Sequence, residues 1–410
     1  MCLLLYPLSA APLGTRGARF IALISGLTAL TALAWWTAQH ASERDLRWSL
    51  WSGIASRLLL FAVPAFLSHD VLRYLWDGYL VTAGLDPYRL TPEAASALYL
   101  GWPPVTDNRQ ITAVYPPGTM ALFTLCAWAG PVLAPWLWRA LITGGSIALL
   151  LVADILLRQS DRRRHLPWVA LSPLLIIESQ VGQHIDVLSA LALLVALYCF
   201  RRQQLARAGA ALGLGTVAKF LPALALLPAI AVGGRKTLLR CGGAMALVMI
   251  LFYSSALLIG LTPLGGLDSF FGKCQFGSPL FALLALIAGP VWSRVALTAL
   301  LAIALVLILK WARRSRQLER AVLYVVAAPL LLAPVVYPWY LMALVPLTAL
   351  YPSGWLIGWT VALPLTYEVL DRFDADGVWA PAAWPLWLVA LAWLIGGVFD
   401  LRKWSRARSQ

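Results

Sequence analysis

The sequence predicts an all-α, polytopic membrane protein, and three observations support this fold class. Hydrophobic residues make up 61% of the 410 positions, only 12% are charged, and the mean hydropathy is +0.77. A soluble chain carries about 25% charged residues. The apolar residues also form runs of about 20 residues, the length that crosses the hydrocarbon core as a helix. Finally, basic residues gather in short clusters at the ends of these runs.

The clearest apolar runs are Phe20–Trp36, Leu137–Leu157, Gly242–Gly260 and Val295–Lys310. Helices are expected, because a spanning segment must satisfy its own backbone hydrogen bonds and these runs lack the alternation of barrel strands. We expect roughly 12 to 14 membrane helices, several of them short or half-inserted, as at Gly118–Pro131. No linker or sequence repeat divides the chain. Residues 1–410 are therefore predicted to form a single membrane domain.

The positive charge of the chain is concentrated in a few loops. Nineteen of the 32 basic residues fall in five clusters, namely Arg158–Arg164, Arg201–Arg207, Arg235–Arg240, Lys310–Arg320 and Arg402–Arg408. Short basic loops at the ends of spans are cytoplasmic by the positive-inside rule. The net charge of +14 therefore indicates contact with anionic membrane lipids and gives no reason to expect a nucleic-acid partner. The five cysteines are scattered, without metal-binding spacing.

The acidic residues fall on the opposite side of the predicted membrane. If the basic clusters are inside, twelve of the 18 acids lie in outer turns: Asp70, Asp77, Asp86, Glu93, Asp107, Glu178, Asp186, Asp268, Glu368, Asp371, Asp374 and Asp376. Carboxylates close to the membrane are costly and indicate a functional site. Residues 68–117 form the longest such segment, a non-cytoplasmic loop that carries the candidate catalytic acids and is expected to contain amphipathic helices.

The start of this loop has a helical pattern. Asp70, Arg73, Tyr74 and Asp77 recur at i, i+3, i+4 and i+7, which places them on one face of a helix. Ser68 is the expected N-cap. One interpretation is a catalytic face directed at a cavity. The alternative is an amphipathic helix at the membrane surface whose polar face meets water.

Several motifs together resemble a known family. They are His69-Asp-x-x-Arg-Tyr-x-x-Trp-Asp-Gly78, Gly84-x-Asp-Pro-Tyr88, Tyr115-Pro-Pro117, Gly182-Gln-His-Ile-Asp186, Ala218-Lys-Phe-Leu-Pro222 and Tyr337-Pro-Trp-Tyr340. In this order they resemble the GT-C integral-membrane glycosyltransferases, above all bacterial polyprenyl-phosphate-mannose-dependent mannosyltransferases and the enzyme that adds the first mannose of GPI anchors. The resemblance runs from about residue 50 to residue 345. The chain departs from many relatives in having His69-Asp70 where they carry two acids.

The resemblance implies an inverting glycosyltransferase that moves a hexose, most closely mannose, from a polyprenyl-phosphate donor. The acceptor is lipid- or envelope-linked and lies on the outer face of the membrane, and no cofactor is implied. An inverting displacement needs a carboxylate base, for which Asp70 is the first choice and Asp77 the second. Asp77 also fits a simple turn residue in Trp-Asp-Gly.

The leaving lipid phosphate requires fixed positive charge. Lys219, at an outer turn, is the first candidate, and its alternative is a lysine satisfied by lipid headgroups. Arg139 is a weaker candidate that also fits a helix-end anchor. Arg73 either binds phosphate or pairs with Asp70 or Asp77, which would lower the pKa of that acid and orient it.

Further residues are predicted to bind the sugar, the acceptor or the lipid. They are His69, Tyr74, Tyr88, Tyr115, His184, Asp186, Tyr337, Trp339 and Tyr340. His184 and Asp186 are also weak candidates for a divalent metal site, but a polar wall of the pocket is favoured, so no metal is predicted. Glu178 fits either a pocket wall or a satisfied buried acid.

Two other classes of function fit the hydropathy. A secondary transporter or flippase of a lipid-linked sugar would place its coupling residues near the bilayer midplane and often has two related halves, neither of which is evident here. A non-catalytic scaffold protein of envelope synthesis gives no reason for outward-facing Asp70, Asp77 and Lys219. No nucleotide-binding motif is evident, which favours a lipid-linked donor. The alanine- and arginine-rich composition favours the bacterial inner membrane, although a protein of the endoplasmic reticulum would have the same pattern.

Overall fold

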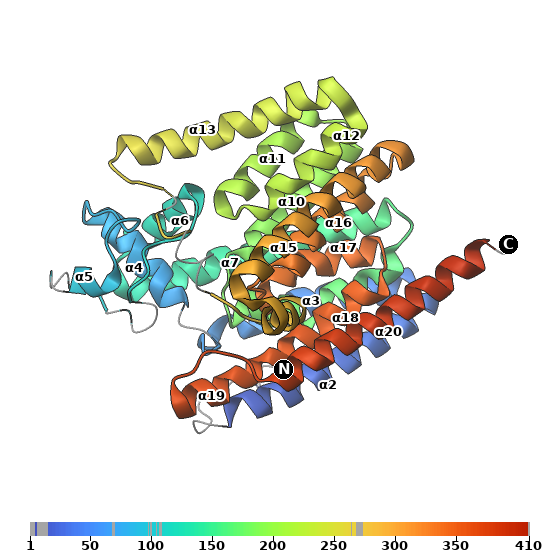
Figure 1. The fold of residues 1–410 in the computed structure, drawn as a ribbon, viewed down its shortest axis with the longest axis horizontal. Coiled ribbons are helices and arrows are strands. Elements are labelled where there is room, and N and C mark those ends of the chain that lie inside the picture. Colours follow the sequence, from blue (N-terminus) through green and yellow to red (C-terminus); the bar gives the residue numbers. More distant parts are fainter. Residues whose placement is uncertain are drawn as a thin grey trace. The chain divides into compact units, whose positions relative to one another are not determined.

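The regular structure of the protein is helical. The computed structural model describes residues 5, 15–67, 70–96, 98, 101–103, 105, 109–263, 265–267 and 274–408. Among these residues the only strand-like pairing is an isolated bridge between Phe276 and Val335, and Figure 1 shows coiled ribbons throughout. The predicted all-α fold class is confirmed.

Five helical segments in the described ranges are long and apolar enough to cross a membrane. They are Arg16–His40, Gly130–Arg158, Leu221–Leu258, Pro279–Ser315 and Ala383–Lys403. Shorter apolar helices accompany them at Pro117–Ala127, Leu205–Ala218 and Pro338–Leu350. Large apolar side chains lie on the surface of these segments, such as Leu286 at 85% and Leu258 at 86% exposure, as expected for helices that face lipid. The chain is an integral membrane protein. The segment Gly118–Pro131, which was predicted to be short, contains a helix of 11 residues, Pro117–Ala127.

The described chain forms two compact units. The first comprises Met1–Pro64, Leu150–Glu178 and Gln275–Gln410, and the second comprises Ala65–Leu149 and Ser179–Cys274. The candidate residues of the first outer loop, together with those of the turns near residues 184 and 219, all belong to the second unit.

The second unit is a set of helices around the first outer loop. Its elements are α4 (Asp70–Thr82), α5 (Pro92–Ser96), α6 (Pro117–Ala127), the first part of α7 (Gly130–Arg158), the end of α9 (Pro173–Gln180), α10 (Asp186–Arg201), α11 (Leu205–Ala218), η4 (Leu221–Ala225), α12 (Leu226–Thr237), η5 (Leu238–Gly242) and α13 (Gly243–Leu258). In Figure 1, α4 lies beside α6, and α11 lies beside both α10 and α13. The helical segment Leu221–Leu258 is kinked at Gly234, where φ is +64°.

Small residues allow the helices around α6 to approach closely. A side chain at Gly78 in α4 would collide with the backbone of Phe123 in α6. A side chain at Gly118 in α6 would collide with Val217 in α11. Close backbone contact at glycine is a common way to pack helices in a membrane. These two contacts join α4, which carries the candidate acids, to α11, which ends at Lys219.

The first unit contains the remaining helices. Its elements are α2 (Arg16–Thr37), η1 (Ala38–His40), α3 (Glu43–Leu59), η2 (Leu60–Ala62), the end of α7, η3 (Arg163–His165), α8 (Leu166–Ala170), most of α9, α15 (Pro279–Ser315), α16 (Leu318–Leu332), η6 (Pro338–Ala343), α17 (Leu344–Leu350), α18 (Gly354–Ala362), η7 (Leu363–Glu368), α19 (Val369–Asp376) and α20 (Ala383–Arg408). Within this unit α18 packs against α20, α15 against α16, and α3 against α8.

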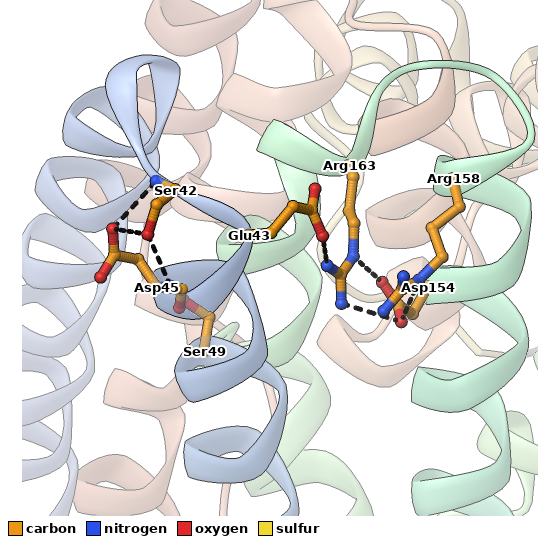
Figure 2. A network of polar contacts seen from close by, with 7 residues as sticks. All are labelled: Ser42, Glu43, Asp45, Ser49, Asp154, Arg158 and Arg163. Atoms are coloured by element: carbon orange, nitrogen blue, oxygen red, sulfur yellow. Dashed lines mark hydrogen bonds and ion pairs between the residues drawn. The ribbon is translucent and has the colours of Figure 1, made fainter.

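A buried arginine joins the first of the basic clusters predicted to be cytoplasmic to the loop near Glu43. Arg163 is 6% exposed, its Nε lies 2.8 Å from the Asp154 carboxylate, and its guanidinium also contacts Glu43 (Figure 2). Arg158, one helical turn after Asp154, shares the same carboxylate at 2.9 Å. A buried charge is tolerated when it is paired in this way. The contacts place the loop near Glu43 on the same side of the membrane as the first basic cluster.

Gly78→Ala should destabilise the second unit by about 1–3 kcal/mol, because the added methyl group must push α4 away from α6. Gly144 in α7 is the matched control, since nothing lies within 4 Å of a methyl group added there. Gly144→Ala should leave stability unchanged or raise it by up to about 1 kcal/mol, because alanine is the better helix former. Thermal unfolding of both variants in lipid nanodiscs measures the difference. Equal melting temperatures for the two variants would contradict the packing of α4 on α6.

Candidate functional site

The polar face predicted for the start of the first outer loop is present in the structure. Asp70 begins α4, and Tyr74 lies one turn further on, with its hydroxyl 3.3 Å from the Asp70 carboxylate. Arg73 and Asp77 form the second pair along the helix, with Nε 2.8 Å from the carboxylate. The i, i+3, i+4 and i+7 spacing therefore predicts the helix and its polar side chains correctly.

Segments distant in the sequence complete the surroundings of Asp70. The hydroxyl of Tyr115 donates to that of Tyr74 at 3.0 Å, so two phenols in series lead to the carboxylate. Nδ1 of His184, from the turn before α10, lies 3.6 Å from Asp70 and 3.5 Å from the Tyr74 hydroxyl. The ring of Tyr74 stacks on Phe123 of α6 with centroids 4.7 Å apart. Packing thus fixes the hydroxyl that meets the acid.

The surroundings determine the protonation of these groups. Burial raises the pKa of Asp70 to about 6, against the opposing effects of the Tyr74 hydroxyl and the positive charge of Lys219. Burial also raises the pKa values of Tyr74 and Tyr115, so both phenols keep their protons. Burial, followed by the charge of Lys219, lowers the pKa of His184, which is therefore a neutral imidazole at pH 7. Asp70 is thus the group among these four that titrates near physiological pH.

A close ion pair lies beside this carboxylate. Lys219 follows α11 and its Nζ lies 2.5 Å from Oδ1 of Asp186, the first residue of α10. The Asp186 residue is 8% exposed, whereas the Lys219 side chain keeps 22% of its surface. We call Asp70, Tyr74, Tyr115, His184, Asp186 and Lys219 the polar centre. It joins the first outer loop to the two outer turns, which the sequence predicts to lie on one side of the membrane.

Asp77 has a different environment from Asp70. It is 1% exposed and paired with Arg73, which also donates from Nη2 to the Ile111 carbonyl at 2.7 Å. Burial raises the pKa of Asp77 to about 6, and Arg73 opposes this increase. The sequence left the partner of Arg73 open, and the structure pairs it with Asp77. The ion pair orients Arg73 within α4, and the hydrogen bond from Arg73 to Ile111 fastens α4 to the later part of the loop.

Asp86 and Tyr88 tie the loop together. The carboxylate of Asp86 accepts from the Tyr88 amide at 3.0 Å and, through its other oxygen, from the Thr262 hydroxyl at 2.6 Å. The Tyr88 residue is 2% exposed, and its hydroxyl donates to the Tyr115 carbonyl at 2.7 Å. The Asp86-Pro-Tyr88 part of the motif therefore forms a turn, with a link to Thr262 that the sequence did not reveal.

Arg139 lies beside a strained residue. Gln183 has φ of +56°, a left-handed conformation that is uncommon for a non-glycine residue. Its carbonyl accepts from Trp138 Nε1 at 3.1 Å. With the side-chain amide turned so that its oxygen faces Arg139, that oxygen accepts from Nη2 at 2.7 Å and from Nε at 3.2 Å. These contacts hold the turn that carries His184 and Asp186, and nothing in the local sequence predicts the conformation of a glutamine here.

Other predicted residues lie elsewhere. Ser68 and His69 are outside the described residues. Tyr337, Trp339 and Tyr340 belong to the first unit, where Tyr337 and Trp339 stack with centroids 4.4 Å apart. Their role in substrate binding stays a prediction. Glu178, also in the first unit, is fully buried and accepts a hydrogen bond from Tyr367 at 2.8 Å, as a satisfied buried acid does.

The described residues contain no group of three His, Cys, Asp or Glu side chains arranged to hold a metal ion. His184 faces Asp70 and Tyr74, and Asp186 is paired with Lys219. Since His69 is outside the described residues, the absence of a metal stays a prediction.

Comparison with known proteins identifies the family. Residues 7–233 match the family model described as alpha-(1->6)-mannopyranosyltransferase, N-terminal domain. The chain belongs to this family. It is therefore a membrane-bound mannosyltransferase of the GT-C type, which decides between the enzyme and the transporter or scaffold interpretations. No curated protein and no solved structure matched the chain.

Arg73→Met should destabilise the mannosyltransferase by about 3–5 kcal/mol, because it leaves the buried Asp77 without its counter-charge. Burial raises the pKa of Asp77 and Arg73 opposes this increase, so in the variant the pKa should rise further and the loss of stability includes the cost of protonating this carboxylate at pH 7. Thermal unfolding in nanodiscs measures the loss. Arg73→Met combined with Asp77→Leu should recover most of it, since no unpaired charge then remains. An Arg73→Met protein as stable as the wild type would contradict the ion pair.

Proposed function

We propose that this enzyme transfers mannose with inversion from a polyprenyl-phosphate donor to a hydroxyl group of a lipid- or envelope-linked acceptor, at the outer face of the membrane. The observation that carries the proposal is the polar centre, where a partly exposed carboxylate and an ammonium group come together. An inverting displacement requires one group to take a proton and another to accept negative charge. Asp70 and Lys219 supply the two.

The difference in exposure supports Asp70 as the base. The Asp70 side chain keeps 34% of its surface, whereas that of Asp77 keeps 2% and is occupied by Arg73. An acceptor hydroxyl must come within hydrogen-bond distance of the base, about 2.6–3.2 Å. Asp70 is open to such an approach. Asp77 then acts as a positioning residue that holds Arg73 and the loop.

Lys219 suits the donor phosphate. Its ammonium group is held by Asp186 and still has an accessible surface. As the glycosidic bond breaks, negative charge accumulates on the phosphate, and a fixed cation at that point stabilises the transition state more than the ground state. Arg139 is 8% exposed and contacts Gln183, which favours its role in holding the turn over its role as a phosphate ligand.

The step can be written with these groups. The acceptor oxygen forms a bond to the anomeric carbon, its proton passes to Asp70, and the bond from that carbon to the phosphate oxygen breaks. The electron pair leaves on the lipid phosphate, which lies against Lys219. Since inversion reverses the anomeric configuration, an α-(1→6) product of the kind named for the family requires a β-linked donor and the C6 hydroxyl of an acceptor sugar.

The outer orientation is supported by the distribution of charge. The loops joined by Arg163 carry the basic cluster that the positive-inside rule assigns to the cytoplasm. The polar centre instead gathers the turns that lie between the basic clusters. A donor with a long apolar chain can reach such a site from the membrane while its phosphate remains at the interface.

Asp70→Asn should lower transfer from polyprenyl-phosphate β-mannose by about 10²–10⁴-fold, because the amide cannot accept the proton. The measurement uses purified protein in nanodiscs, a radiolabelled donor and an acceptor extract from membranes. Asp77→Asn serves as the control, since it removes a carboxylate of similar pKa without removing the proposed base. An Asp70→Asn enzyme of full activity would contradict the assignment.

The pH dependence of the wild type should reflect the same group. Asp70 is protonated below its pKa of about 6 and cannot then act as a base. Activity, measured as kcat/KM, should therefore be highest above pH 6 and should fall about tenfold per unit below it. This acid limb should persist in Asp77→Asn. If it disappears there, Asp77 and not Asp70 is the titrating group.

Lys219→Met should reduce kcat by about 10²–10³-fold, the usual effect of removing one group that stabilises a developing anion. Lys219→Arg keeps the charge and should retain more activity than the methionine variant. Lys236→Met removes an exposed lysine of a predicted cytoplasmic cluster and should have no effect. Equal activities of Lys219→Met and Lys236→Met would exclude Lys219 as the phosphate ligand.

A further inference from the structure

The two carboxylate oxygens of Asp186 have different surroundings. Oδ1 lies 2.5 Å from Lys219 Nζ. Oδ2 is buried and has no hydrogen-bond partner among the described residues. The side chain as a whole is 9% exposed. A buried carboxylate oxygen without a donor is costly, so such an oxygen in a native site calls for an explanation.

The turn before Asp186 holds this carboxylate in place. Gln183 adopts its left-handed conformation because Trp138 donates to its carbonyl and Arg139 faces its side chain. Strained backbone of this kind persists where the surrounding structure enforces it, and it is concentrated at binding sites. From the other side, Lys219 fixes Oδ1. The Asp186 carboxylate is thus held beside Lys219 from one side and by its turn from the other.

The charge beside Oδ2 favours a neutral hydrogen-bond donor as its ligand. A cation at Oδ2 would be repelled by the adjacent Lys219 ammonium group. A hydroxyl group has no net charge and supplies the hydrogen that the carboxylate lacks. Sugars supply hydroxyl groups, and the proposed donor carries one beside its reacting carbon.

We propose that Asp186 Oδ2 binds the C2 hydroxyl of the donor's mannosyl group. This inference rests on the proposed function, in which Lys219 binds the donor phosphate. The anomeric carbon is bonded to a phosphate oxygen, and C2 is the next ring carbon. The carboxylate that holds Lys219 is therefore adjacent to the position where the C2 hydroxyl must lie. Asp186 becomes a specificity-determining residue, because mannose and glucose differ only in the direction of this hydroxyl.

The same contact would assist the reaction. As the bond to phosphate breaks, positive charge develops at the anomeric carbon, and hydrogen bonds to the C2 hydroxyl strengthen in such transition states. Asp186 then affects turnover as well as binding, whereas Lys219 acts on the leaving group. Asp186 thus binds the sugar, and Lys219 binds the phosphate, on either side of the glycosidic bond that breaks.

The test compares the wild type and one variant with each of four donors, so that the effect of the variant can be separated from the effect of removing a sugar hydroxyl. The donors are polyprenyl-phosphate β-mannose, its 2-deoxy analogue, its 4-deoxy analogue and the corresponding glucose compound. The variant is Asp186→Asn, whose amide oxygen must face the Lys219 ammonium group, so that its NH₂ group, which cannot accept a hydrogen bond, occupies the position of Oδ2. Transfer is measured as kcat/KM in nanodiscs, and donor binding is measured separately by microscale thermophoresis.

The wild type should use the 2-deoxy donor and the glucose donor about 10- to 100-fold less well than the mannose donor, the usual effect of losing a hydrogen bond to a charged group. With the mannose donor, kcat/KM of Asp186→Asn should be lower than that of the wild type by a similar factor. With the 2-deoxy donor, the variant and the wild type should have equal kcat/KM. With the 4-deoxy donor, the variant should lower kcat/KM by the same factor as with the mannose donor. Asp376→Asn, which changes an exposed carboxylate of α19, is the control and should leave all four values unchanged.

Two results would overturn the inference without involving the proposed function. One is a wild type that uses the 2-deoxy donor as well as mannose, a result that requires no variant to fold. The other is an Asp186→Asn enzyme that loses the same factor with every donor. A wild type that neither binds nor transfers any of these lipid-linked sugars would instead reject the proposed function, and this inference with it.

Discussion

The ion pair between Lys219 and Asp186 is the contact on which the rest of the site depends. It joins the end of α11 to the start of α10, and its 2.5 Å separation fixes an ammonium group beside a carboxylate. This charge lowers the pKa of Asp70 against the effect of burial and adds to the burial that lowers the pKa of His184. Without Lys219, the buried Asp186 carboxylate would lose its counter-charge, and the site proposed for the donor phosphate would lose its cation.

Glycine packing and aromatic stacking bring the other members to this pair. Gly78 and Gly118 let α4, α6 and α11 approach closely, so that the ring of Tyr74 lies on Phe123 of α6 while its hydroxyl meets Asp70 within α4. A site that stabilises charge must be rigid before substrate binds, because the cost of reorganising it during the reaction would reduce the stabilisation of the transition state. The Arg73–Asp77 pair and the Asp86–Thr262 contact restrain the loop in the same way. The protein thus holds the carboxylate proposed as the base on a helix, and the rest of the loop supports this helix.

The sequence predicted features that follow from local pattern and charge. The spacing from Asp70 to Asp77 predicted the helix, and the alternation of basic and acidic turns predicted that the turns of Asp186 and Lys219 lie on one side. It could not predict that these two side chains meet, because their separation depends on how α10 packs against α11. It also could not distinguish Asp70 from Asp77, since both are helical aspartates and only tertiary packing leaves 34% of the Asp70 side chain exposed but 2% of that of Asp77. The left-handed Gln183 has no sequence signal at all.

The most direct test of this account is the position of the donor phosphate in a complex. Cryo-electron microscopy of the Asp70→Asn enzyme with polyprenyl-phosphate β-mannose in nanodiscs would locate it, because the variant should bind the donor without consuming it. The account predicts the phosphate against Lys219, with the anomeric carbon between it and residue 70. A phosphate bound instead among the basic residues of the loop near Arg163, with the polar centre empty of sugar, would contradict the account.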